Sequence, residues 1–163
     1  MKITKILALA AVTCFLPSCL TTSKPKNVMT PLEIQYIQSR EYDVSKDIAF
    51  RSVISVFQDI GYIIKKADLH SGFISAESSS TSKSNWLHMK HKNGSTVVRQ
   101  TKATAFVEKI GNKSKIRLSF VNIKKTSYSK GQKSRSDKPI LDASLYQNAF
   151  EKVENAIFLR KQS

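Results

Sequence analysis

The strongest nucleophiles in the chain are two thiols close to its N-terminus, Cys14 and Cys19. A deprotonated thiol can attack a substrate, bind a metal or accept a lipid group. Cys14 lies inside an apolar run, whereas Cys19 stands where that run gives way to the polar stretch Leu20-Thr-Thr-Ser-Lys-Pro-Lys26. A cysteine at such a boundary is typical of a processing site that follows an export signal.

The segment before Cys19 has the composition of a signal peptide. Lys2 and Lys5 supply a positive N-terminal region, and an apolar run follows. At about 11 residues this run is too short to span a bilayer, which requires about 20. We therefore predict a signal peptide over residues 1–18, a flexible tether over residues 19–32 and a single basic domain over residues 33–163.

The residues Leu16-Pro17-Ser18-Cys19 resemble the lipobox of bacterial lipoproteins. That motif has an aliphatic residue, then a small residue directly before the cleavage site, and an obligatory cysteine after it; Pro17 departs from its usual middle position. The resemblance implies that Cys19 receives a diacylglyceryl group, becomes the first mature residue and anchors the chain to a membrane. Cys14 follows Thr13, a poorer residue before a cleavage site, and is interpreted as part of the apolar run.

The residue after the anchor bears on location. In enterobacterial lipoproteins an Asp at this position signals retention in the inner membrane, and here the position is Leu20. We therefore expect the protein at the outer membrane, facing the periplasm. The alternative interpretation of the whole segment is a buried N-terminal helix that contains a cysteine by chance.

The rest of the chain contains no clear catalytic constellation. His88 and His91 are three residues apart and would share one face of a helix, but a zinc site requires three or four ligands. No carboxylate or thiol stands near them, and the chain has no Gly-x-Ser-x-Gly motif and no glycine-rich phosphate loop. We therefore expect no enzymatic activity, no cofactor and no bound metal.

The charge of the chain predicts an anionic partner. The 27 Lys and Arg residues and 12 Asp and Glu residues give a formal net charge of +15, and removal of Lys2 and Lys5 with the signal peptide leaves 25 − 12 = +13. Such a charge attracts anionic surfaces. An exported protein meets little nucleic acid, so we expect anionic lipid, lipopolysaccharide or an acidic envelope protein instead. The alternative explanation of the charge is solubility alone.

Two basic stretches that each contain an aromatic residue are candidate binding segments. Cations beside an amphipathic aromatic ring suit phosphate-rich or interfacial surfaces. The alternative is that both stretches are solvated loops. The candidates of the first stretch are Lys83, Trp86, Lys90 and Lys92, and those of the second, a basic loop over residues 124–138, are Lys124, Lys125, Tyr128, Lys130, Lys133 and Arg135.

The spacing of apolar residues predicts an α+β fold. Helical periodicity covers residues 45–60 and 143–160, and residues 62–67, 73–77, 95–110 and 115–123 have the composition or alternation of strands. Residues 32–42 suit a short helix or an edge strand, and residues 78–85 form a polar, low-complexity run. We expect a two-layer sandwich: an antiparallel sheet of about four strands with two helices packed on one face.

Four strings of the chain resemble an uncharacterised family of small proteobacterial lipoproteins. They are residues 29–42, 53–62, 67–76 and 146–158. The resemblance brings no activity and no catalytic residues. More distantly, the order helix, Gly61, strand, Asp68-x-x-x-Gly72, strand resembles the helix-grip domains of BamC-type outer-membrane assembly lipoproteins. That likeness implies an accessory protein of an envelope complex, and a direct binder of anionic lipid is the alternative.

Overall fold

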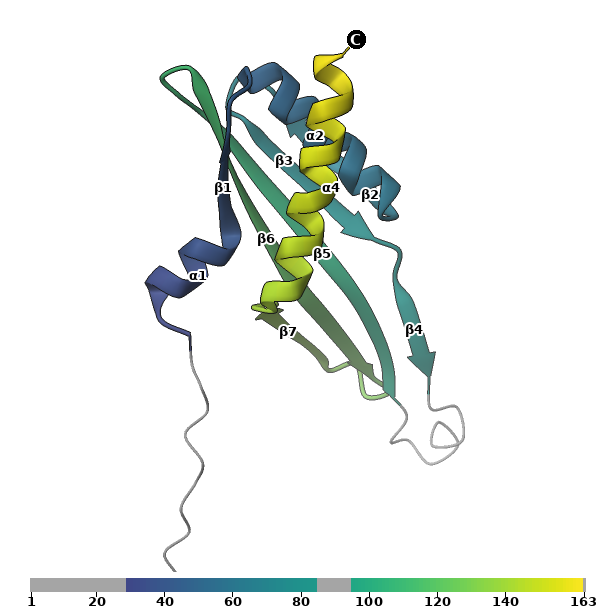
Figure 1. The fold of residues 1–163 in the computed structure, drawn as a ribbon. Helices are drawn as coiled ribbons and strands as arrows, with labels where there is room; N and C mark the ends of the chain where they lie inside the picture. Colours follow the sequence, from purple (N-terminus) through teal and green to yellow (C-terminus); the bar gives the residue numbers. More distant parts are fainter. Residues whose placement is uncertain (1–28, 85–94, 163) are drawn as a thin grey trace, which may run out of the picture.

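The computed structural model describes residues 29–84 and 95–162 (Figure 1). In this part of the chain, one antiparallel sheet of seven strands accompanies three helices. The strand order is β1-β6-β5-β3-β2, with β4 beside the start of β5 and β7 beside the second half of β6. The elements are α1 (Pro31–Gln38), β1 (Ser39–Tyr42), α2 (Lys46–Asp59), β2 (Tyr62–Asp68), β3 (Phe73–Ser78), β4 (Thr81–Ser84), β5 (Ser95–Ile110), β6 (Lys113–Tyr128), β7 (Lys133–Pro139) and α4 (Ala143–Lys161).

The expected sandwich of about four strands and two helices is wrong, because the sheet is larger. Strands β5 and β6 are 16 residues long and pair along their whole length. No single neighbouring strand is long enough to pair with the whole outer edge of either one. Strands β3 and β4 therefore pair with different parts of β5, and β1 and β7 pair with different parts of β6. The segment predicted as either helix or edge strand contains both, α1 followed by β1.

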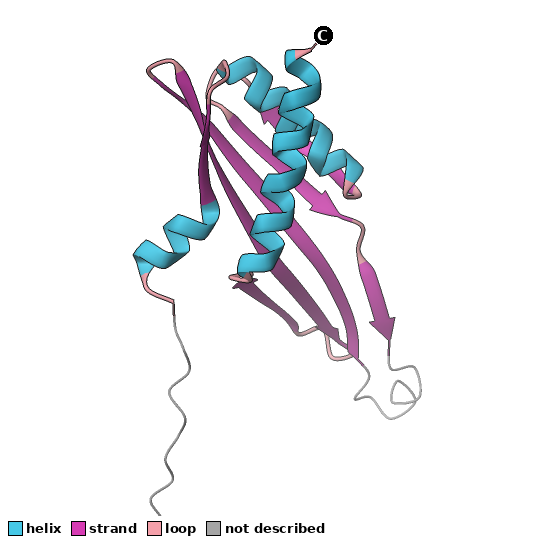
Figure 2. Cartoon of the chain, viewed as in Figure 1, coloured by secondary structure: helices cyan, strands magenta, loops and turns pink. Residues whose placement is uncertain are grey.

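Helices α2 and α4 cross the same face of the sheet and bury one core against it (Figure 2). The helical side of this core includes Val53 and Phe57 of α2 and Phe150 and Val153 of α4. The sheet side alternates as a half-buried sheet must. It consists of Ile74, Ala76, Ala103, Ala105, Val107, Ile116, Leu118 and Phe120.

Helix α2 begins and ends where the sequence predicts. The Ser45 hydroxyl caps it by accepting a hydrogen bond from the Ile48 amide at 3.4 Å, which satisfies one orphan donor of the first turn. At the other end Gly61 has φ +84°, a left-handed conformation that residues with a Cβ disfavour. The helix therefore stops at a fixed point and returns the chain to the sheet as β2.

The turn between β2 and β3 is built around Gly72, which has φ +76°. The Asp68 carboxylate accepts hydrogen bonds from the Ser71 hydroxyl at 2.7 Å and from the His70 amide at 3.0 Å, and these bonds hold the pKa of Asp68 below its usual value. The Val107 amide donates to the Gly72 carbonyl at 2.8 Å. A Cβ on residue 72 would collide with the Val107 carbonyl, so the turn touches β5 backbone to backbone.

Helix α4 is fixed to the sheet through the hydroxyl of Tyr146, which is 1% exposed. This hydroxyl accepts hydrogen bonds from the Phe120 amide at 3.3 Å and from the Gln38 side chain at 3.2 Å, and donates to the Ile140 carbonyl at 3.0 Å. Strand β7 ends at Pro139, opposite Val121; just beyond it the Phe120 carbonyl accepts from the Ile140 amide at 2.9 Å, and the Tyr146 hydroxyl takes the place of a strand carbonyl as acceptor for the Phe120 amide. One side chain thus joins α1, α4 and the edge of β6.

The basic loop predicted over residues 124–138 is wrong, because this segment is mostly strand. Residues 124–128 continue β6, residues 133–138 belong to β7, and a short turn joins them. Part of the polar run at 78–85 likewise forms β4. In the described part of the chain, no helix is long and apolar enough to cross a membrane.

Candidate anion-binding site

The two helices leave a large part of their own side of the sheet bare. Helix α4 begins part-way along β6 (Figure 1), and the last fully buried pair beneath the helices is Ala103 and Phe120. Beyond that pair the strands continue for several residues, and the side chains on the same side are polar except for Val97. We call this region, made of residues 95–101 of β5, 122–128 of β6, and strands β4 and β7, the bare helix-side surface.

The strand register places three cations together on this surface. Arg99 pairs with Lys124, and Lys124 pairs with Ser136. One step toward the helices, Asn122 pairs with Lys138. Because side chains alternate across a strand, all of these residues lie on the side that carries Phe120. We call Arg99, Lys124 and Lys138 the cationic cluster.

The cationic cluster lines a cavity of about 280 Å³. The other lining residues are Asn122, Ile123 and Ser136, so none of the described residues around this cavity is a carboxylate. The cations that form ion pairs among the described residues are different ones, namely Arg51, Lys113, Lys115 and Arg135. Three positive charges without a described counter-ion, beside an amide and a hydroxyl, favour an oxyanion.

The opposite side of the sheet carries Lys125, Lys133 and Arg135, and there the charges are partly neutralised. Arg135 donates two hydrogen bonds to the Asp137 carboxylate, at 2.8 and 2.7 Å. These bonds hold the pKa of Asp137 below its usual value, with smaller contributions from the charges of Arg135, Lys125 and Lys102. Glu77, which pairs with Lys102 of β5, also faces this side. This face is therefore mixed in sign, unlike the cationic cluster.

The structure divides the predicted binding residues. Lys83 on β4 and Lys124 on β6 alternate onto the bare helix-side surface, while Lys125, Lys133 and Arg135 alternate onto the opposite side. Tyr128 ends β6 and is 43% exposed, and Lys130 lies in the turn before β7. Trp86, Lys90, Lys92 and Cys19 lie outside the described residues.

Arg99 and Lys138 complete the cationic cluster and are absent from the residues predicted to bind. Arg99 belongs to a segment that the sequence predicts as a strand, and Lys138 to one that it predicts as a loop. The missing information is the pairing of the strands. Extending the predicted hairpin by two positions beyond the pair of Thr101 and Asn122 sets Arg99 opposite Lys124.

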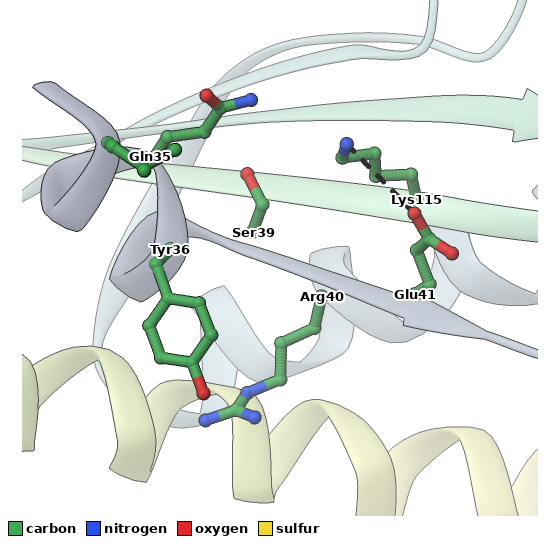
Figure 3. A pocket seen from close by; sticks show the side chains of 7 residues that line it. Gln35, Tyr36, Ser39, Arg40, Glu41 and Lys115 are labelled. Atoms are coloured by element: carbon green, nitrogen blue, oxygen red, sulfur yellow. Dashed lines mark ion pairs between the residues drawn. The ribbon is translucent and has the colours of Figure 1, made fainter.

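A larger cavity of about 550 Å³ lies where α1 meets β1 (Figure 3). Its charges already have partners: Lys115 lies 4.0 Å from Glu41, and the Arg40 guanidinium lies 5.3 Å from the centre of the Phe150 ring. Leu32 and Tyr36 line its outer rim and are 75% and 83% exposed. The arrangement joins α1 to the domain, and both of these cations already have a contact within it.

The described residues offer no metal site, and the comparisons with known proteins assign no role to the cationic cluster. Among the described residues, no three side chains of His, Cys, Asp or Glu lie close enough to hold a metal ion, and His88 and His91 lie outside the described part. No protein-family model matches the chain, and the search of curated proteins gives no match. The resemblance to small lipoproteins and to BamC-type domains therefore stays a prediction.

Proposed function

We propose that this protein is a lipid-anchored, non-enzymatic binding protein of the cell envelope, and that its cationic cluster binds the headgroups of anionic lipids. The observation that carries the proposal is the register that gathers Arg99, Lys124 and Lys138 around one cavity. The residue sequence Leu16-Pro17-Ser18-Cys19 supports the anchor. The net charge of +15 supports attraction to an anionic membrane.

The chemistry of the cavity suits a phosphate group. A guanidinium offers two parallel donors to an oxyanion, and lysine ammonium groups add compact positive charge. Asn122 and Ser136 offer further polar groups at the same place. The described lining includes no histidine, cysteine or carboxylate to act as a nucleophile or general base, which is why we propose binding and not catalysis.

Vesicle binding tests the proposal. The probe is the Cys19→Ser protein, which accepts no lipid, mixed with vesicles of phosphatidylcholine alone or of phosphatidylcholine with phosphatidylglycerol. We expect sedimentation with the anionic vesicles only, weakening as salt is added. Replacing Arg99, Lys124 and Lys138 by Ala together should weaken binding about 100-fold, because each basic residue near such a surface contributes about 1 kcal/mol.

A second triple variant controls for total charge. Lys65, Lys66 and Lys161 are exposed and lie on β2 and at the end of α4, so their replacement by Ala removes the same three charges elsewhere. We expect this variant to lose less than about 10-fold in affinity. Equal losses in the two triple variants would refute the site. Equal binding of the unsubstituted protein to both kinds of vesicle, or to neither, would refute recognition of anionic lipid and leave an acidic protein as the partner to seek.

A further inference from the structure

An apolar cavity of about 330 Å³ lies between the two helices, close to the cationic cluster. Ile60 at the end of α2 and Leu145 and Ala149 of α4 form its walls, and Tyr62 and Phe120 of the sheet form its floor. The two floor rings meet edge to face, 6.3 Å between centres. Polar side chains of α4, including Asn148, stand at the rim. We call this cavity the wedge.

The wedge and the cationic cluster are successive zones of the same side of the sheet. In β6, Phe120 forms part of the floor of the wedge, and Asn122 and Lys124 line the cavity of the cationic cluster. The side chains of all three residues lie on one side of the sheet. At about 3.4 Å per residue, the step from Phe120 to Asn122 is only about 7 Å. The surface therefore changes from apolar to polar to cationic over two steps of one strand.

A hydrogen bond spans the boundary between the two zones. The Thr101 hydroxyl donates to the Asn122 side chain at 3.2 Å, and these two residues are paired across β5 and β6. Burial raises the pKa of the nearby Tyr62 phenol. Thr101 and Asn122 thus place polar groups between Phe120, on the floor of the wedge, and the cationic cluster.

We propose that the ligand of this protein is a single-chain anionic amphiphile, whose alkyl chain enters the wedge while its phosphate or carboxylate group sits on the cationic cluster. This inference rests on the proposed function, because it takes the cationic cluster as the headgroup site. An apolar cavity beside uncompensated positive charge is complementary to a molecule with one apolar end and one anionic end. A headgroup of an intact bilayer would occupy the cluster alone and leave the wedge empty.

Two ligands that share a phosphate group, one with an alkyl chain and one without, test the inference. The full chain with Cys19→Ser is titrated with dodecyl phosphate, kept below its micelle concentration, and with inorganic phosphate. Amide NMR signals locate each ligand and give its affinity. We expect both ligands to shift the signals of Arg99 and Lys124, and only dodecyl phosphate to shift those of Phe120 and Ala149. Dodecyl phosphate should bind at least about 100-fold more tightly, since each buried methylene contributes about fourfold.

Substitution at the rim separates the wedge from the headgroup site. Asn148 is exposed, so Asn148→Trp fills the wedge with little risk to folding. Asn155→Trp is the matched control, because it places the same ring at an exposed position of α4 that does not line the wedge. Asn148→Trp should reduce the advantage of dodecyl phosphate to less than about 10-fold while inorganic phosphate binds as before. Asn155→Trp should bind both ligands like the unsubstituted protein.

The outcomes distinguish the two proposals. If inorganic phosphate binds at the cationic cluster but dodecyl phosphate gains nothing, or if Asn148→Trp leaves its advantage unchanged, the wedge proposal is wrong and the proposed function stands. If neither ligand shifts Arg99 or Lys124, both proposals fail. Dodecyl phosphate shifts at Phe120 that depend on protein concentration would show self-association of the wedge instead, and would also overturn the inference.

Discussion

Two glycines with the same backbone conformation differ in what surrounds them, which allows strain and steric contact to be separated. Gly72 has φ +76° and lies against the Val107 carbonyl, whereas Gly131 has φ +81° and open space where a Cβ would lie. We expect Gly72→Ala to lower the free energy of unfolding by about 3 kcal/mol or more, because left-handed strain adds to a backbone collision. Urea denaturation followed by circular dichroism measures the loss.

Gly131→Ala is the control for strain alone. It should cost only about 1–2 kcal/mol, the usual penalty for a Cβ in the left-handed region. If the two substitutions cost the same, the approach of the β2–β3 turn to β5 is looser than the structure shows. That result would also mean that this turn does not hold β5 firmly in place beneath the helices.

At the scale of elements, one buried hydroxyl group adds to the apolar packing that docks α4 on the sheet. Tyr146→Phe keeps the buried ring and removes the acceptor for Phe120 and the donor to Ile140. Leaving such groups without partners costs about 1–3 kcal/mol each when they are buried. We therefore expect the variant to unfold at lower urea with an unchanged slope, and Tyr128→Phe, which alters an exposed ring, to behave like the unsubstituted protein.

The elements with strong apolar periodicity could be predicted from the sequence, and the polar edge strands could not. Helix α2 and strand β5 lie within one residue of their predicted bounds, because burial of one face dictates the spacing of their apolar residues. Strands β4 and β7 carry almost no apolar residues. They are strands because the long edges of β5 and β6 offer hydrogen-bonding partners, and this depends on pairing that local sequence does not encode.

The same limit applies to the candidate site. Lys124 and Lys125 are neighbours in the sequence, and the charge of their segment predicts an anion-binding region. Alternation along β6 nevertheless sends them to opposite sides of the sheet, and only Lys124 joins the cationic cluster. Its other members come from partner strands, so the composition of the site was partly predictable and its geometry was not.

For the whole molecule, the decisive test concerns Cys19. The lipobox resemblance predicts that the unsubstituted protein enters the membrane fraction of a producing Gram-negative cell and incorporates labelled fatty acid. Cys19→Ser should abolish the label, whereas Cys14→Ser should preserve it, since Cys14 is interpreted as part of the signal peptide. Retention of the label in the Cys19→Ser protein would show that the anchor was assigned to the wrong residue.

The position of α1 has a consequence for the strength of binding that the proposed site requires. Pro31, the first residue of α1, stands twelve residues after Cys19, and twelve extended residues reach at most about 40 Å. With Cys19 acylated, the domain would be confined to a thin shell above the bilayer. Short connections of this kind raise the effective concentration of a second ligand to about the millimolar range. A site that binds free amphiphiles only weakly in solution could therefore be well occupied at the membrane surface.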